Sequence, residues 1–402
     1  MRSIAKLMKD WQFTGPDGVT AAVVLPHTWN AVDGQDGGND YWRGTCTYRT
    51  SFAAPAFDPA QQQVWLQFEG VNSSATVLLN GQKLCTHDGG YSTFRAEITE
   101  LLQAENQLAV QVDNSVNDRV YPQKADFTFY GGIYRDVSLL VVNKNHIALG
   151  HFGDTGVKIT PDLKEGSADI QVETLVEGEG TVVVELLDAE GSTVAKGEGS
   201  KASLHLDAPH LWNGVKDPYL YTCIVRLMQE GKPVDEVTTK VGIRSFSVDA
   251  KKGFFLNGKP YPLHGVSRHQ DRKGLGNAIT REMHDEDMAL IRELGANTVR
   301  LAHYQHDQYF YDLCDKYGMV VWAEIPYISE HLPNGRENTI SQMKELIHQN
   351  YNHPSIVCWG VSNEITISTK DKADMLDNHR VLNELCHKMD STRLTTLACY
   401  AM

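Results

Sequence analysis

The segment Asn352–Glu364 has the sequence NHPSIVCWGVSNE, an apolar run that ends in an amide and a carboxylate. Its centre, Ile356–Trp359, is too short for a buried helix, is rich in strand formers and is bounded by a proline and a glycine, so it predicts a buried strand. Asn363 and Glu364 then stand at the C-terminal strand end, where parallel α/β barrels form their active sites. A carboxylate held there is suited to acid catalysis, although a surface Asn-Glu pair after a core strand would have the same sequence.

The composition of the chain is that of a globular protein. Its 402 residues, 41% hydrophobic and 22% charged, allow two or three domains. A formal net charge of -14 without a long basic run argues against a nucleic-acid partner. The first ten residues lack a signal-peptide core, no apolar stretch is long enough for a membrane span, and seven scattered cysteines without a CxxC pair fit reduced, buried thiols. These features predict a soluble cytoplasmic protein without membrane partners.

The first part of the chain, residues 1–145, is predicted to be an all-β, jelly-roll-like sandwich. Short β-rich runs alternate with turn clusters, and Asn80-Gly81 is a hairpin signal because both residues tolerate positive φ. The loops 33–41 and 126–136 combine glycine, aspartate and aromatic residues. Such loops suit a sugar-binding surface, and they are equally common as plain turns.

Residues 146–246 form a second series of strands separated by glycine and acidic turns. A segment of roughly 100 residues with about seven strands is typical of an immunoglobulin-like sandwich. No catalytic cluster stands out in it, so this domain is predicted to be a spacer.

From residue 247 to 402, strands alternate with helices, which predicts βα units of a TIM (β/α)8 barrel. The expected strands are 261–266, 297–301, 319–325, 356–359 and 394–398. The expected helices run from the N-cap Thr280 through Glu293 and over 308–317, 339–350 and 372–389. Only about five of the eight units are present, so we expect a partial barrel with an uncovered sheet edge.

Polar residues follow each of the first four barrel strands. They are His264 and Arg268-His269-Gln270-Asp271, then Arg300 and His303, then Glu324, and finally Asn363-Glu364. Their convergence on one face would form an enzyme pocket. Zinc ligation by His264, His269, His303 and Glu364 is the alternative, but no local HxxxH or HxH pair supports it.

The chain resembles glycoside hydrolase family 2, and within it the β-galactosidases. The resemblance spans nearly the whole chain and rests on the domain order and on five motifs: Gly131-Gly-Ile-Tyr-Arg-Asp-Val137, Gly242-Ile-Arg244, Gly265-Val-Ser-Arg-His-Gln-Asp271, Asn297-Thr-Val-Arg-Leu-Ala-His-Tyr304 and Trp359-Gly-Val-Ser-Asn-Glu364. It implies retaining hydrolysis of terminal β-D-galactosyl residues, with a β-galactoside as substrate.

The resemblance also implies roles for single residues. Glu364 matches the general acid/base, and Asn363 matches the residue that hydrogen-bonds the sugar 2-hydroxyl. Sugar contacts fall on His303, His269 and Asp126, and with less support on Asn39 or Asp40. Arg300 and Glu324 match supporting residues, although Arg300 is equally suited to a purely structural ion pair.

Two departures from the family pattern limit these expectations. A retaining enzyme needs a second carboxylate about 5 to 5.5 Å from the first as nucleophile, and in this family it lies on a later barrel strand. The nucleophile is therefore absent from this sequence, and we expect the 402 residues alone to be inactive. In the magnesium-binding segment of some relatives, Ile328 stands where a glutamate is expected, and Glu330 and His331 could replace it only with a shifted loop. No cofactor is therefore expected, with Mg²⁺ in that segment as the open alternative.

Two alternative functions stay open. One is a β-glucuronidase or another β-glycosidase of the same family; the tyrosine after His303 and the Ile-Pro-Tyr at 325–327 favour galactose over it. The other is a non-catalytic carbohydrate-binding fragment. The oligomeric state is open as well, with a homo-oligomer of a full-length form as one option.

Overall fold

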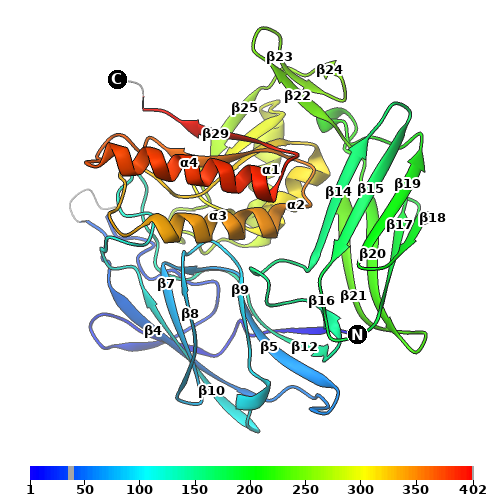
Figure 1. The fold of residues 1–402 in the computed structure, drawn as a ribbon. Helices are drawn as coiled ribbons and strands as arrows, with labels where there is room; N and C mark the ends of the chain where they lie inside the picture. The colour runs from blue at the N-terminus through cyan, green and yellow to red at the C-terminus, as the bar shows by residue number, and fades with distance from the viewer. Residues whose placement is uncertain (35–39, 401–402) are drawn as a thin grey trace.

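A computed structural model describes residues 1–34 and 40–400 and shows two β-sandwiches that support an α/β part. In Figure 1 the first sandwich runs from blue to cyan, the second is green, and the α/β part runs from yellow to red. The predicted fold class is confirmed. The domain boundaries proposed after residues 145 and 246 stay a prediction.

The first sandwich packs two antiparallel sheets around one apolar core. Its six-stranded sheet has the order β3-β2-β4-β10-β7-β8: β3 (Thr20–Val23), β2 (Trp11–Thr14), β4 (Thr45–Ala53), β10 (Glu105–Asp113), β7 (Ser74–Leu79) and β8 (Gln82–Asp88). Its four-stranded sheet has the order β1-β12-β5-β9: β1 (Ser3–Lys6), β12 (Val137–Asn143), β5 (Gln62–Phe68) and β9 (Phe94–Glu97). Asn80 and Gly81 have φ of 51° and 79° in the β7–β8 hairpin, which confirms that turn.

The second sandwich has the alternating burial of an immunoglobulin-like domain. One sheet has the order β14-β15-β19: β14 (Val157–Leu163), β15 (Ser167–Thr174) and β19 (Lys201–Asp207). The other has the order β18-β17-β20-β21: β18 (Thr193–Glu198), β17 (Thr181–Leu187), β20 (Tyr221–Gln229) and β21 (Lys232–Val241). Every second residue of β15 and β20 is buried between the sheets, as period-two patterning requires.

Short elements join these parts. The strands β6 (Val71–Asn72) and β11 (Gly132–Ile133) pair beside the first sandwich, and β13 (His146–Ile147) pairs with β16 (Val176–Glu177) at the junction of the two sandwiches. The strands β22 (Phe246–Asp249), β23 (Gly253–Leu256) and β24 (Lys259–Pro260) lead into the α/β part. The 3-10 turns are η1 (Thr99–Leu101) and η2 (Gly214–Lys216).

The α/β part is a five-stranded parallel sheet in sequential order. Its strands are β25 (Gly265–Arg268), β26 (Thr298–Leu301), β27 (Val320–Glu324), β28 (Ile356–Asn363) and β29 (Leu394–Ala398). The helices between them are α1 (Arg281–Glu293), α2 (Gln308–Tyr317), α3 (Arg336–Asn350) and α4 (Lys372–Met389). The largest apolar core lies between this sheet and its helices.

Three predicted elements are corrected. The first barrel strand is β25, four residues later than expected, because pairing with β26 begins at Gly265 and Tyr261 packs instead beside Trp212. The third helix begins at Arg336 rather than residue 339. Thr339 therefore lies inside the helix, where it is buried and its hydroxyl donates to the Arg336 carbonyl. The strand β28 continues through Asn363, so this amide belongs to the strand itself.

The α/β part is fastened to the first sandwich through α3. Asn338 accepts a hydrogen bond from the Tyr121 backbone (2.9 Å), and Glu345 pairs with His87 (2.8 Å).

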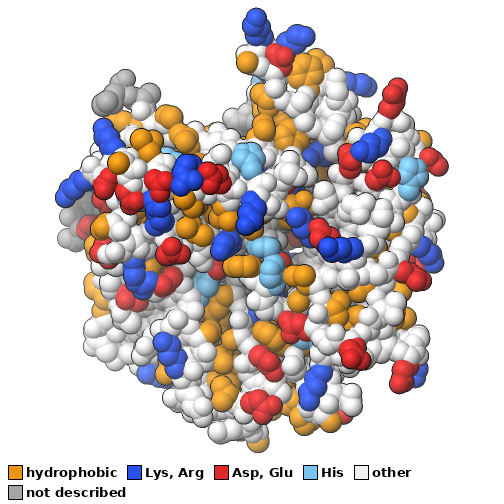
Figure 2. Space-filling model, viewed as in Figure 1, with side chains coloured by type: hydrophobic (Ala, Val, Ile, Leu, Met, Phe, Trp, Pro, Cys, Tyr) orange, Lys and Arg blue, Asp and Glu red, His pale blue; other side chains and the backbone are white. Residues whose placement is uncertain are grey.

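Figure 2 shows acidic and basic side chains interspersed over one face of the molecule. Within residues 1–34 and 40–400, no helix combines the length and apolar character that crossing a bilayer requires.

The seven cysteines are all free. Cys46, Cys223, Cys314 and Cys386 are buried, as expected of small apolar groups. Cys399 is exposed, so the prediction of buried thiols is wrong for that residue.

Candidate active site

Arg300, on β26, is the centre of the polar cluster at the C-terminal strand ends. Its Nε lies 3.1 Å from Glu324 Oε1, and its Nη2 lies 3.0 Å from Glu324 Oε2. The same Nη2 donates to Asn363 Oδ1 at 2.6 Å. One guanidinium therefore holds side chains from β27 and β28 together, because neighbouring parallel strands bring their carboxyl ends to one edge.

Glu324 is fully buried and has a second partner in His303. The His303 Nδ1 lies 2.8 Å from Glu324 Oε1 and 3.2 Å from Arg300 Nη2. A buried carboxylate is stable only with such paired donors. Glu324 is thus suited to orient Arg300 and His303.

Glu364 follows Asn363 directly and leaves the strand in a left-handed conformation, with φ of 47°. Its backbone N–H donates to the Ala398 carbonyl of β29 at 2.8 Å, and its side chain is partly exposed. A non-glycine residue with positive φ is uncommon and occurs often at functional sites.

His269 forms an aromatic wall beside this cluster. Its ring centroid lies 5.1 Å from that of His303 and 4.9 Å from that of Phe127, which comes from the first sandwich. Its Nδ1 lies 3.4 Å from the Tyr304 hydroxyl. Burial, and then the charge of His303, lowers the pKa of His269, so the neutral imidazole is favoured near pH 7.

A cavity of about 580 Å³ opens next to His269, between the first sandwich and the α/β part. Its lining residues are Tyr41, Ala125, Asp126, Phe127, Thr128, His269 and Asp271. Asp126 and Asp271 face it from the two domains, and aromatic rings provide a stacking surface. Hydrogen-bonding carboxylates beside aromatic faces suit a polyhydroxylated ligand.

A side-chain contact joins the Asp126 segment to the segment that follows Glu364. Lys124 donates from Nζ to Ser368 Oγ at 2.7 Å, and the Ser368 backbone donates to the Ser329 carbonyl. The loop of the first sandwich is thereby tied to the loop after β28. This contact places the sandwich cavity beside the strand ends.

The structure brings Arg300, Glu324, His303 and Asn363 into direct contact, with His269 packed alongside, Asp126 at the adjoining cavity and Glu364 next to Asn363. Asn39 lies outside the described residues. Phe127 lies in the predicted sugar-binding loop 126–136 and Asp271 in the predicted polar cluster, but neither residue has a predicted role of its own. The signals that could have identified them are the aromatic residue directly after Asp126 and the carboxylate two residues after His269.

Other residues of the predicted cluster point elsewhere. His264 lies before β25, at the opposite strand end, because the strand begins later than expected. Arg268 is buried and bonds Asp287 of α1 at 2.7 Å. In the segment compared with the magnesium-binding relatives, His331 lies 2.6 Å from the Tyr327 hydroxyl and also pairs with Asp374, so its ring is already engaged at both nitrogens.

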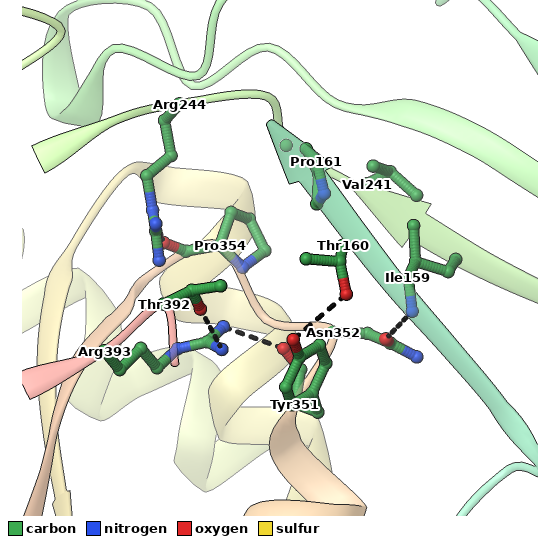
Figure 3. Close-up of a pocket in the computed structure, with 11 residues that line it drawn as sticks. Ile159, Thr160, Pro161, Val241, Arg244, Tyr351, Asn352, Pro354, Thr392 and Arg393 are labelled. Atoms are coloured by element: carbon green, nitrogen blue, oxygen red, sulfur yellow. Dashed lines mark hydrogen bonds between the residues drawn. The ribbon is translucent and has the colours of Figure 1, made fainter. Parts of the chain in front are cut away.

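A second hollow, shown in Figure 3, lies where the immunoglobulin-like domain meets the α/β part. It measures about 30 Å³, and Arg244 and Arg393 border it. Arg393 donates to the carbonyls of Tyr351 and His353, and Arg244 donates to those of Pro354 and Ile356. Because both guanidinium groups already donate to backbone carbonyls, this hollow is a structural seam, that is, a contact between the two domains.

Comparison with protein families gives three matches in the order of the three domains. Residues 38–163 match the galactose-binding domain-like model of glycosyl hydrolase 2, and residues 151–244 match the model of glycosyl hydrolases family 2. Residues 247–400 match the TIM barrel domain of the same family.

The similar proteins include enzymes named β-glucuronidase and an enzyme named β-galactosidase. A β-glucuronidase of Bacteroides fragilis is 39% identical over 98% of this chain and 60% of its own length. The crystal structure of an FMN-binding β-glucuronidase from Facaelibacterium prausnitzii L2-6 superposes with a TM-score of 0.96 at 43% identity, covering 99% of this chain and 64% of that one. A β-galactosidase of Thermoanaerobacter pseudethanolicus is 33% identical over 83% of this chain and 46% of its own length. The chain thus spans about half to two thirds of these relatives.

Proposed function

Because this chain belongs to glycosyl hydrolase family 2, we propose that it supplies the acid/base half of a retaining β-glycosidase site, with β-glucuronides as the preferred substrate class. The observation that carries the proposal is the Arg300 cluster. It fixes Asn363 at the end of β28 immediately before Glu364. A carboxyl and an amide on one strand end can act on the glycosidic oxygen and on the 2-hydroxyl of the same sugar.

In this mechanism Glu364 protonates the departing glycosidic oxygen and later removes a proton from the attacking water. Asn363 donates from its amide nitrogen to the sugar 2-hydroxyl, since its oxygen is occupied by Arg300 at 2.6 Å. That hydrogen bond strengthens as the transition state gains oxocarbenium character. His269, Asp126 and Asp271 contact the remaining hydroxyls at the cavity.

Glu324 is a positioning residue in this proposal. Both of its oxygens accept hydrogen bonds from Arg300, and His303 adds a third contact. These contacts fill three of the roughly four acceptor positions of the carboxylate, and the side chain is fully buried, so Glu324 is poorly suited to attack an anomeric carbon. The retaining mechanism therefore requires another carboxylate, and we expect the 402 residues alone not to turn over a glycoside.

Glucuronide is preferred to galactoside for two reasons. The relatives with 39% and 43% identity are named β-glucuronidases, whereas the β-galactosidase is 33% identical. In addition, the two tyrosines that favoured galactose are buried and engaged: the Tyr304 hydroxyl accepts from the Gln270 backbone, and the Tyr327 hydroxyl contacts His331. Neither hydroxyl is placed to select a sugar.

β-Galactoside hydrolysis is the second candidate. Its support is the 33%-identical relative that is named a β-galactosidase. The two sugars differ at C6, where a carboxylate replaces a hydroxymethyl group, and at the orientation of the C4 hydroxyl. A direct comparison of the two substrate classes distinguishes the candidates.

The experiment measures hydrolysis of chromogenic β-glucuronide and β-galactoside by the chain alone and mixed with a fragment carrying the later barrel strands of the B. fragilis relative. We expect activity only in the mixture, with the glucuronide preferred. Glu364→Gln should lower kcat by about 10² to 10⁴-fold. The matched control Glu330→Gln, a partly exposed glutamate of the neighbouring loop, should leave the rate unchanged. Turnover by the unmixed chain, or full activity of Glu364→Gln, would contradict the proposal.

A further inference from the structure

A cluster of two histidines and one aspartate joins the immunoglobulin-like domain to the α/β part, away from the polar strand ends. His151 and Asp154 lie in the loop before β14, and His348 lies in the last turn of α3. The His151 Nδ1 lies 2.9 Å from Asp154 Oδ2, and the His348 Nδ1 lies 3.4 Å from the same oxygen. One donor atom from each residue falls within 4.8 Å of the other two.

The cluster is held in place by surrounding contacts. The other Asp154 oxygen, Oδ1, accepts from the Gly156 backbone at 2.8 Å, and the Asp154 carbonyl accepts from Arg95 at 2.6 Å. The His348 ring stacks on Phe152, with centroids 4.8 Å apart and planes within 3°. Such outer contacts orient ligands in metal sites, because they fix the direction of each lone pair.

The spacing of the donor atoms suits a tetrahedral transition-metal ion. With metal–ligand bonds of about 2.0 to 2.1 Å, neighbouring donors of a tetrahedral zinc site lie roughly 3.3 Å apart. The contacts of 2.9 and 3.4 Å bracket that separation, and the two histidine donor atoms lie within 4.8 Å of each other. Two imidazoles and a carboxylate are donors that Zn²⁺ accepts readily.

There is also room for a fourth ligand. His151, Asp154 and His348 border a cavity of about 170 Å³, with Glu173 of β15 on its wall. The side chains of the two histidines are 36% and 27% exposed, so an ion can reach them from solvent. A water molecule can therefore complete four-coordination.

A second group with metal-ligand chemistry, formed by Asp312, Asp315 and His353, does not have this freedom. The side chains of Asp315 and His353 are only 4% and 13% exposed, so an ion reaches them from solvent less easily than it reaches His151 and His348. The Asp315 carboxylate also organises the start of β28. Among the residues that the structure describes, the His151 cluster is therefore the better candidate.

We propose that His151, Asp154 and His348 form a binding site for a divalent transition metal of the Zn²⁺ class. The ion fastens the loop before β14 to the C-terminal turn of α3 and so stabilises the contact between the two domains. The site is structural, and its occupation is independent of glycoside hydrolysis.

The test is Zn²⁺ titration of the chain by calorimetry, with Co²⁺ absorption as a second readout of tetrahedral geometry. The variants are His348→Ala, Asp154→Asn and His151→Ala; the last truncates a 36% exposed side chain, so the fold is retained. His205→Ala is the matched control, because His205 pairs with Asp169 at 2.7 Å on the exposed face of the same domain.

We expect the wild-type chain and His205→Ala to bind one more Zn²⁺ than the three cluster variants, or to bind it more than about 100-fold more tightly. Zn²⁺ should raise the Tm of the wild type, EDTA should reverse the rise, and the cluster variants should show neither effect. Equal stoichiometry and affinity in the wild type and His151→Ala would overturn the proposal. So would absence of saturable Zn²⁺ binding in the wild type.

Discussion

Arg300 and Glu324 form a two-point ion pair between adjacent strands, with Nε 3.1 Å from Oε1 and Nη2 3.0 Å from Oε2. Glu324 is completely buried, whereas the Arg300 side chain is 20% exposed. The arginine is thus the partner that compensates a desolvated charge, and it also holds Asn363 through a hydrogen bond from Nη2. Stability and site geometry depend on the same guanidinium.

Replacing Arg300 by alanine should destabilise the protein by about 3 to 5 kcal/mol, because it leaves a buried carboxylate without its main partner. Arg300→Lys should recover part of this stability but not the two-point geometry. Urea unfolding measures the stability of both variants. Arg380→Ala, which removes an ion pair from the exposed face of α4, is the control and should cost less than about 1 kcal/mol. Equal losses in the two alanine variants would refute the role given to Arg300.

Phe127→Ala should weaken substrate binding more than it slows the chemical step. The ring centroid lies 4.9 Å from that of His269 and 5.6 Å from that of Tyr304, and the ring borders the 580 Å³ cavity. We expect KM to rise about tenfold, with kcat changed less than threefold, in the reconstituted enzyme. Phe57→Ala, a partly buried ring of the first sandwich, should leave KM unchanged. A fall in kcat at constant KM would contradict this assignment.

Glu69 should make stability depend on pH. Burial, and then the charges of Asp307 and Asp136, raises the pKa of Glu69 from 4.5 to about 7. The folded protein binds this proton more tightly than the unfolded chain. The contribution of Glu69 to the free energy of unfolding is therefore fully present below about pH 4.5 and is lost as the pH rises to about 7. Glu69→Gln should therefore gain stability relative to the wild type across this interval, by at most about 3 kcal/mol.

Chemical unfolding at pH 4.5, 6 and 8 checks this prediction. Glu100→Gln, an exposed glutamate of η1, is the control and should follow the wild type at every pH. If the stability difference between Glu69→Gln and the wild type is the same at all three values, Glu69 is not the titrating group.

Arg393→Ala should loosen the seam shown in Figure 3. The side chain is 5% exposed, pairs with Asp390 at 2.8 Å and donates to the Tyr351 carbonyl at 2.7 Å. Its removal takes the cationic partner away from the buried Asp390 and the side-chain donor away from the Tyr351 carbonyl, which should cost about 3 kcal/mol or more. Thermal unfolding compares it with Lys388→Ala, an exposed cation at the end of α4. A Tm change no larger than that of the control would contradict the role.

Several elements could be predicted from the sequence because short-range interactions set their ends. The helix α2 spans the predicted residues 308–317, since the Asp307 side chain caps its first turn and Gly318, with φ of 75°, closes it. The helix α4 also has its predicted bounds, with the Asp371 side chain accepting a hydrogen bond from the Asp374 backbone. These signals act within four residues, so the sequence carries them completely.

The start of α3 could not be predicted in the same way. Arg336 begins the helix because Asn338 is fixed by the Tyr121 backbone, 217 residues away in the chain. The register of β25 likewise depends on its pairing with β26. Long-range partners decide these boundaries, and no local pattern identifies them.

The sequence by itself determined the order of three domains, the parallel strands and the adjacency of Asn363 to Glu364, because periodicity, caps and turns act locally. Only the tertiary structure decided which polar strand ends meet. Arg300 reaches Asn363 across 63 residues, whereas Arg268, with the same apparent strand-end position, turns to Asp287. Hydrogen bonds at the end of a sheet depend on strand register and on the burial of each charge, and these properties arise only when the strands pack together.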